Sequence, residues 1–476
     1  MLNTCTYIFV FKMETNVHET YQSVLSGRYA SKQMQTLFSD EHKIARWRKL
    51  WIWLAQAEME LGLPMIHPEQ IDDMQAHIND IDWSMIKTFE KQLRHDVMAH
   101  VHAFELAAPK AKGIVHLGAT SAYVQDNATS FIDYSGQTGR PMGPGFAYRF
   151  STCQFFQIVR KLDRRICELA GFFDSETEKG CFTITGQTYS RMQDCSVICS
   201  LAMLGAAVHK ICMDIRMLQC FDELMEPFES SQVGSSAMPY KRNPMRSERC
   251  CGLARFLINM PPNAFHTEAI HGFERTLDDS SNRRLVLPES FLTADALLLT
   301  FQNILEGLRV NHAAIARHVD HEMPFLVLEA ILMHMTLRGA DRQVAHEKIR
   351  LLALKAHAIR EQSGEYGSEM LQLLKGDCFF EPVWPFLSDL LLPERHIGLS
   401  PMQVEEFCSR QLFPIIQPYK SKLLSPSILE LCKKCECCIV DNAKQATIWL
   451  QAKLKGDYVT TYKISACNKL TLTLAF

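Results

Sequence analysis

Two long segments of the chain repeat apolar residues in alternating steps of four and three positions. The first contains Val197, Leu201, Leu204, Val208, Ile211, Ile215 and Leu218, and the second contains Phe291, Ala294, Leu298, Phe301, Leu305 and Leu308. This spacing is typical of a heptad seam, along which one face of an α-helix packs against other helices. It predicts two long helices in a bundle whose seams are shared between subunits. Packing of both helices within one monomeric core remains an alternative.

Shorter helices are predicted on either side of these two segments. Ser39 and Asp40 are favourable N-cap residues for a helix whose apolar positions are 44, 47, 51 and 54. Residues 68–78 and 83–93 predict two more helices, whereas residues 123–157 show no helical period. The main body contains no run of alternating strand pattern. The chain is therefore predicted to be all-α, with a long helical bundle as its core.

The pattern divides the chain into five segments. A disordered leader is expected at 1–20, and a tail of atypical, strand-like character at 433–476. Between them we expect a smaller N-terminal helical domain at 21–120, a central helical-bundle domain at 121–311 that is truncated around 130–160, and a smaller C-terminal helical domain at 312–432.

Composition narrows the function classes. The 476 residues carry a formal net charge of -3, which argues against a nucleic-acid partner. No apolar run reaches bilayer-spanning length, so no membrane partner is expected. The seventeen cysteines are expected to be reduced, as in cytoplasmic proteins. The cluster Cys432, Cys435, Cys437 and Cys438 lacks a second Cys/His pair at zinc-ligand spacing, so no metal site is predicted.

The loop between the two long helices carries the chemistry of greatest interest. Its sequence is G-S-S-A-M-P-Y-K-R-N-P at 234–244, and its two prolines exclude a helix interior. Ser235 offers a hydroxyl, while Lys241 and Asn243 offer anion-binding groups. Proton abstraction beside a carboxylate requires this combination. A solvated connecting loop with ordinary surface Lys and Arg is the alternative.

Four other polar stretches could bind an anion. The run Arg94-His95-Asp96 precedes a helix, where free N–H groups attract anions, although a surface turn is the alternative. Thr120 and Ser121 form a small-residue turn. Ser280 and Arg284 share one face if their segment is helical, and could hold a phosphate or form a solvated face. The pair Arg28–Tyr29 is exposed and carries little information alone.

Several of these stretches together resemble one family. The run at 234–251, E-R-T-L-D-D-S-x-N-R-R at 274–284, S-G-R-Y-A-S at 26–31, R-H-D-V-M-A-H-V at 94–101, H-L-G-A-T-S at 116–121 and I-T-G-Q-T-Y at 184–189 are similar to motifs of the adenylosuccinate lyases, animal type, in the fumarase/aspartase superfamily. The resemblance covers roughly residues 20–130 and 160–430.

The resemblance implies a homotetramer around a helical bundle, with active sites built from three subunits. It implies a lyase of purine nucleotide biosynthesis that releases fumarate by β-elimination. The substrates would be the nucleotide adenylosuccinate, which gives AMP, and SAICAR, which gives AICAR. No metal or organic cofactor is expected.

The resemblance also implies a role for individual residues. Ser235 takes the Cβ proton, Lys241 and Asn243 hold the aci-carboxylate charge, and Glu248 orients the catalytic histidine. The substrate contacts implied are Arg28, Tyr29, Arg94, His95, Asp96, Thr120, Ser121, Gln187, Arg249, Arg275, Ser280 and Arg284.

The chain departs from the family at the general acid. The family's T-H-x-Q-P-A-Q motif is absent, and no histidine lies between His116 and His209. Ser121 and Gln187 are 66 positions apart, too few for two long bundle helices at about 1.5 Å per residue. Three interpretations follow. The chain is a spliced or incorrectly predicted version of a lyase, which we favour, and such a chain could assemble with intact subunits. It is an inactive paralogue or isoform that binds nucleotide or acts as a structural oligomer subunit. Or another histidine substitutes.

Overall fold

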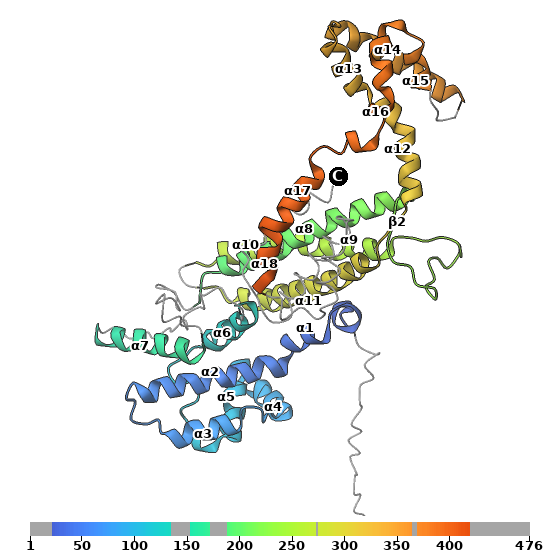
Figure 1. The fold of residues 1–476 in the computed structure, drawn as a ribbon. Coiled ribbons are helices and arrows are strands. Elements are labelled where there is room, and N and C mark those ends of the chain that lie inside the picture. Colours follow the sequence, from blue (N-terminus) through green and yellow to red (C-terminus); the bar gives the residue numbers. More distant parts are fainter. Residues whose placement is uncertain (1–20, 135–152, 172–187, 273–274, 364–368, 419–476) are drawn as a thin grey trace, which may run out of the picture. The chain divides into compact units, whose positions relative to one another are not determined.

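The computed structural model describes residues 21–134, 153–171, 188–272, 275–363 and 369–418. These residues form two compact units, and Figure 1 labels their elements. The first unit comprises residues up to 206 and 252–299, and the second comprises 207–251 and residues from 300 onward. The leader predicted at 1–20, the tail predicted at 433–476 and Gln187 lie outside the described residues. The predicted domain boundaries stay a prediction.

The first unit is helical. Its elements are η2 (Leu25–Tyr29, one turn of π-helix), α1 (Lys32–Leu37), α2 (Asp40–Glu60), α3 (Pro68–Ala76), α4 (Trp83–Leu93), α5 (Asp96–Ala107), η3 (Pro109–Ala111), α6 (Ser121–Tyr134), α7 (Cys153–Leu169) and α10 (Pro261–Ala269). Three helices contribute residues to both units, namely α8 (Met192–Cys220), α9 (Met245–Ile258) and α11 (Asp278–Gly307).

The second unit adds shorter helices and two very short strands. Its elements are β1 (Leu224–Met225), β2 (Arg309–Val310), α12 (His312–Leu326), α13 (Leu328–Leu337), α14 (Arg342–Ser363), α15 (Glu369–Lys375), η4 (Cys378–Phe386), α16 (Leu387–Leu390), η5 (Pro393–Arg395), α17 (Ser400–Phe407), η6 (Cys408–Leu412) and α18 (Phe413–Ile416). The strands pair antiparallel, with Leu224 opposite Val310. The predicted all-α class is confirmed.

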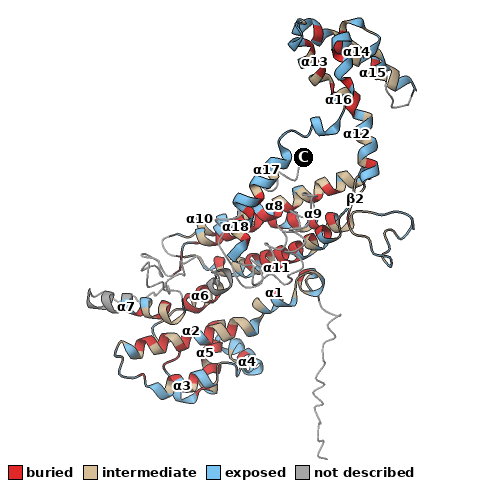
Figure 2. Ribbon diagram, viewed as in Figure 1, coloured by how far each residue is buried: buried red, intermediate tan, exposed pale blue. Residues whose placement is uncertain are grey.

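The two heptad segments form the longest helices, as predicted. In α8 the seam residues are buried except for the half-buried Ile211 and Leu218, and in α11 they are buried up to Leu305. Figure 2 shows this burial along both helices. Sharing of these seams between subunits stays a prediction.

The expectation that no segment could span a membrane was wrong by length and composition. Among the described helices, α8 and α11 are both long and apolar enough to do so. The most apolar windows of these helices are 56% and 67% buried within the protein, however. Burial of this kind is typical of core helices, which satisfy the same criterion because they need no polar face.

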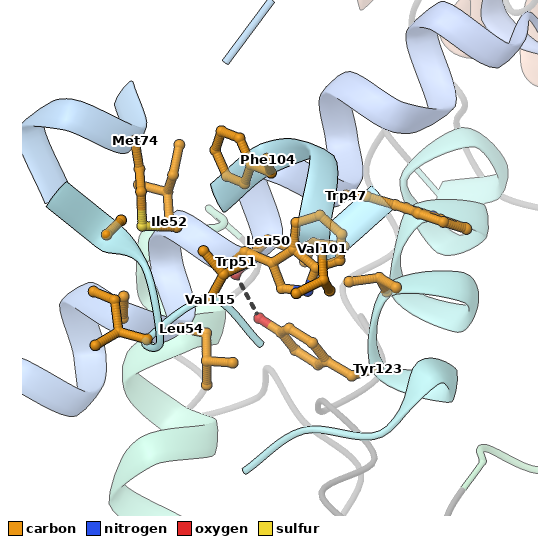
Figure 3. Packing of buried hydrophobic residues seen from close by; sticks show 14 of the residues in the cluster. Trp47, Leu50, Trp51, Ile52, Leu54, Met74, Val101, Phe104, Val115 and Tyr123 are labelled. Atoms are coloured by element: carbon orange, nitrogen blue, oxygen red, sulfur yellow. Dashed lines mark hydrogen bonds between the residues drawn. The ribbon is translucent and has the colours of Figure 1, made fainter. Parts of the chain in front are cut away.

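The core of the first unit is built around α2, as Figure 3 shows. Ser39 caps α2, because its Oγ accepts the N–H of His42 at 3.2 Å. The Trp51 ring stacks on Phe104 at 6.0 Å between centroids. The hydroxyl of Tyr123 donates to the Leu50 carbonyl at 2.8 Å, which ties α6 to α2.

Helix α6 corrects one expectation. Residues 123–157 were predicted to lack helical structure, yet α6 extends to Tyr134 and α7 begins at Cys153. The reason lies in burial: of residues 122–128, only Gln125 is not fully buried. Polar and apolar side chains are buried alike here, because Asp126 and Asn127 are as shielded as Val124 and Ala128. The positions of the apolar residues alone therefore do not mark the buried face of α6.

Candidate active site

A cavity of 1080 Å³ in the first unit brings most of the predicted substrate contacts together. Residues of α4, α5, the turn before α6 and the start of α11 line it. The sequence-predicted residues at its wall are Arg94, His95, Asp96, Thr120, Ser121, Arg275, Ser280 and Arg284. Five Lys or Arg side chains and two carboxylates face it, so an anionic ligand is favoured.

The junction between α4 and α5 forms one corner of the cavity. Arg94 ends α4 in the left-handed region, with φ of 54°, and this sharp turn starts α5 two residues later. His95 is the N-cap of α5, and its Nδ1 accepts the N–H of Met98 at 3.3 Å. These turns place the three polar side chains together at a helix N-terminus, where the helix dipole attracts anions.

Asp96 and Arg284 connect this corner to α11. The Arg284 guanidinium donates to Asp96 Oδ2 at 2.5 Å. Burial opposes the charge on Asp96, but hydrogen bonds from Arg284 and the Val97 N–H outweigh it and hold the pKa of this carboxyl below its usual range. Ser280 lies one turn before Arg284 on α11, and both line the cavity, as their spacing predicts for a helix.

The turn before α6 forms the opposite side of the corner. Ser121 Oγ lies 3.4 Å from His95 Nε2. Thr120 Oγ1 is shielded from solvent and has no hydrogen-bond partner among the described residues, so it remains available to a ligand.

His116 is a cavity residue that the sequence did not single out. Burial, and secondarily the charge of His95, lowers the pKa of His116 to about 4. Its Nδ1 accepts the Trp51 indole N–H at 2.9 Å, so the neutral ring presents an N–H at Nε2. Lys87 and Lys91 also line the cavity. Their spacing of four on α4, followed by Arg94, is a helical basic stripe that could have revealed them.

The loop with Ser235 lies in the second unit and is held at its base. The Gln219 side chain bonds both ends, accepting the Glu226 N–H at 3.2 Å and donating to the Arg242 carbonyl at 3.1 Å. Glu226 in turn accepts the N–H of Ser247 at 2.9 Å at the start of α9. These contacts fix where the loop leaves and rejoins the helices.

Within the loop, the segment from 234 to 243 closes on itself. Asn243 Nδ2 donates to the Gly234 carbonyl at 3.3 Å. A Cβ at Gly234 would lie 2.1 Å from the Lys241 carbonyl oxygen, so glycine is required for this approach. Ser235 Oγ accepts two main-chain N–H groups, from Ala237 at 3.3 Å and Met238 at 3.1 Å. Donors aimed at this oxygen favour its ionised form.

The other predicted residues of this region lie on exposed or half-buried surface. Lys241 and Glu248 are exposed, and Arg249 is half-buried on α9.

Arg28 and Tyr29 do not line the cavity. They belong to η2, and the adjoining Ser31 N–H donates to Asp295 Oδ2 at 2.6 Å. Asp295 lies eleven residues after Arg284 on α11, which corresponds to about 16 Å along the helix axis. The Arg28–Tyr29 corner is therefore anchored away from Ser280 and Arg284 in the same chain.

No metal site is evident among the described residues. In the part of the chain that the structure describes, no group of three or more His, Cys, Asp or Glu could hold a metal ion. The Cys432–Cys438 cluster lies outside it.

Comparison with known proteins gives consistent matches. A family model described as "Adenylosuccinate lyase C-terminus" matches residues 324–407, and one described as "Lyase" matches residues 155–257. The chain is 38% identical over 472 residues to adenylosuccinate lyase of Caenorhabditis briggsae, covering 84% of this chain and 97% of the relative. It is 37% identical over 478 residues to adenylosuccinate lyase of Saccharomyces cerevisiae, covering 85% and 98%.

Solved structures support the fold. A 3-carboxy-cis,cis-muconate lactonizing enzyme from Pseudomonas putida matches with a TM-score of 0.64 at 18% identity, covering 79% of this chain and 96% of that chain. A fumarate lyase from a Mesorhizobium species matches with a TM-score of 0.61 at 19% identity, covering 80% and 97%. At this identity the likeness shows the helical fold alone.

Proposed function

Because the chain belongs to the adenylosuccinate lyase family, a family of C–N lyases, we propose that it binds a purine nucleotide and takes part in releasing fumarate from adenylosuccinate and SAICAR. The observation that carries the proposal is the cation-rich cavity, which gathers eight residues predicted as substrate contacts from separate parts of the sequence. The absence of the general-acid motif implies that the chain alone is an impaired lyase.

The proposed chemistry begins at Ser235. Its ionised Oγ takes the Cβ proton of the succinyl group, and the C–H electron pair moves into the neighbouring carboxylate. Lys241 and Asn243 would hold the resulting dianion. When this dianion collapses, the C–N bond breaks and fumarate leaves. The leaving nitrogen takes up a proton from water, since this chain lacks the family's general-acid motif. The two N–H donors on Ser235 Oγ support its role as the base.

We further propose a homotetramer in the cytoplasm, with active sites built from three subunits. The separation between the Arg28–Tyr29 corner and Arg284 within one chain supports this assembly. In a tetramer, the Arg28–Tyr29 corner of one subunit and Arg284 of another could contact the same phosphate. Sizing by light scattering tests the tetramer.

A second candidate function is a nucleotide-binding or structural subunit without turnover. Two observations favour it. The chain has no histidine between His116 and His209, where the family places its general acid. The alignments to the two relatives span 472 and 478 positions but only 84% and 85% of this chain, about 400 residues, so about 70 aligned positions have no counterpart here.

One assay separates the two candidates. The purified chain is incubated with adenylosuccinate, and its loss is followed by absorbance. An impaired lyase retains slow turnover that Ser235→Ala abolishes, while the adjacent exposed Ser236→Ala is the matched control. Turnover unchanged by Ser235→Ala would remove Ser235 from the mechanism. Binding of AMP by calorimetry without any turnover would support the second candidate, and turnover at the rate of an intact relative would contradict the impairment.

A further inference from the structure

A line of alternating, largely buried charges runs through the first unit, from the Tyr189 hydroxyl at one end to the wall of the cavity at the other. Neighbouring members are joined by hydrogen bonds and come from α6, from the segment that begins α8, and from the start of α11. In order, the members are Tyr189, Asp194, Arg283, Asp126, Arg191, Asp279 and Arg275. Only the last, Arg275, is among the residues of the 1080 Å³ cavity.

Arg191 is the centre of this line. Its side chain is 1% exposed and spans two carboxylates. Nη1 donates to Asp126 Oδ2 at 3.0 Å, while Nη2 and Nε donate to Asp279 Oδ2 at 2.6 and 3.2 Å. A guanidinium held by two planar partners has almost no rotational freedom, so Asp279 is fixed in position.

Asp279 connects Arg191 to Arg275 at the wall of the cavity. Its Oδ2 is occupied by Arg191, and its Oδ1 accepts Nη2 of Arg275 at 3.3 Å. Burial opposes the charge on Asp279, but Arg191 outweighs it through its hydrogen bond and charge, aided by Arg275. Together they hold the pKa of the carboxyl below its usual range. The carboxylate therefore stays ionised and keeps its hold on Arg275.

Arg275 has capacity left for a ligand. Its side chain is 12% exposed, and its Nε–H is shielded from solvent without a hydrogen-bond partner among the described residues. A guanidinium anchored at one end presents its remaining donors in a fixed direction, which lowers the entropy lost when an anion binds.

We propose that Asp279, held in place by Arg191, is a positioning residue that orients Arg275 toward the phosphate or carboxylate of the bound nucleotide. Asp279 contacts no ligand in this scheme and acts only through Arg275. The inference rests on the proposed nucleotide-binding function and adds two residues, Arg191 and Asp279, that the motifs did not assign.

The test is AMP binding to the full-length chain by calorimetry. Asp279→Asn keeps the size of the side chain but loses its charge, and should weaken AMP binding about tenfold, the effect of losing one charged hydrogen bond. The matched control is Asp278→Asn, because Asp278 is an exposed neighbour in the same first turn of α11. This control removes the same charge from the helix N-terminus and should leave affinity within about twofold.

A double-mutant cycle separates positioning from general stability. In an Arg275→Ala background, Asp279→Asn should have no further effect on AMP affinity, because its only route to the ligand is gone. If the Asp279→Asn variant shows no cooperative thermal transition, Arg191→Lys is tested in its place. Lysine keeps the positive charge but cannot donate to both carboxylates in the geometry of the guanidinium. Arg191→Lys should weaken AMP binding about threefold when Arg275 is present. It should have no effect on AMP binding in the chain that carries Arg275→Ala.

Equal weakening in both backgrounds would show a structural role only and overturn the inference, as would unchanged affinity in Asp279→Asn. Either result leaves the proposed function standing, because the unsubstituted chain still binds AMP. Failure of the unsubstituted chain to bind AMP overturns both.

Discussion

Two histidines, the buried His100 and the half-buried His116, make the stability of the first unit depend on pH between neutral and mildly acidic solution. Burial, and secondarily the charge of His95, lowers the pKa of His116 to about 4. Burial, followed by the charges of Lys43 and Arg48, lowers the pKa of His100 to about 4. In the unfolded chain histidines titrate near 6.5, so the native state binds fewer protons than the unfolded state between these values.

The sign and size follow from proton linkage. The stabilisation is fully present above about pH 6.5 and is lost as the pH falls toward the folded values near 4. Below about pH 6.5 each histidine lowers the free energy of unfolding by about 1.4 kcal/mol per pH unit. At about pH 5 the loss is therefore about 2 kcal/mol for each histidine and about 4 kcal/mol for the pair. A loss of that size is a large fraction of a typical folding free energy of about 5–15 kcal/mol.

Urea unfolding at a series of pH values between about 7 and 5 measures this loss. Tryptophan fluorescence reports on the same core, because Trp47 and Trp51 lie beside the two histidines. His116→Asn removes one titrating group and suits the backbone φ of 64°, which asparagine tolerates. His100→Phe removes the other while keeping a ring against the Trp47 edge.

The double variant His116→Asn/His100→Phe should lose most of this pH dependence, and the remainder should come from His42, whose pKa is lowered by burial and then by the charge of Arg46. The control His67→Gln, at an exposed position of the same unit, should retain the loss seen in the unsubstituted chain. The reasoning is refuted if the unsubstituted chain is equally stable at pH 7 and 5, or if the double variant keeps the full loss.

Three further predictions follow from single contacts. Gly234→Ala would place a Cβ 2.1 Å from the Lys241 carbonyl oxygen. Residual turnover should therefore fall about 100-fold through misplacement of the loop, while Gly252→Ala, with open space around it, should raise the thermal midpoint. Glu226→Ala removes the carboxylate that caps α9 and should cost about 1–3 kcal/mol in urea unfolding; no loss would contradict the capping role. Arg48→Met leaves the carbonyls of residues 77 and 80 without this donor and should cost about 1–3 kcal/mol in urea unfolding; a neutral result would show that water replaces the guanidinium.

The fold could be predicted where local signals and tertiary packing agree. Helix α4 has the predicted bounds, Trp83–Leu93, because Asp82 caps it and Arg94 ends it in a left-handed turn. The two heptad helices were predicted from periodicity alone. Helix α6 was missed because polar Asp126 and Asn127 are buried among apolar residues, and no local feature of the sequence reveals that environment.

The candidate site could likewise be predicted only where local sequence motifs carry the information. Residues within recognisable motifs, such as Ser121 and Arg284, could be named from the sequence, and the cavity brings them together. His116 and Asp279 also lie within the quoted motifs, but no role could be assigned to them, because their partners come from segments distant in sequence. Arg191 and Asp279, for example, are 88 positions apart. Pairings of this kind are set by the packing of helices, which periodicity does not specify.

The line of buried charges also constrains how this chain can change over generations. Removing an inner member takes from two buried neighbours one of the two charged groups that each contacts, and breaking buried ion pairs in this way typically costs about 3–5 kcal/mol. Exchange of Arg191 for an apolar residue would therefore survive only beside a compensating loss at Asp126 or Asp279. Substitutions at these positions should appear together in related sequences. A sequence that carries only the first of two such substitutions would fold poorly, because the second substitution has not yet compensated for it.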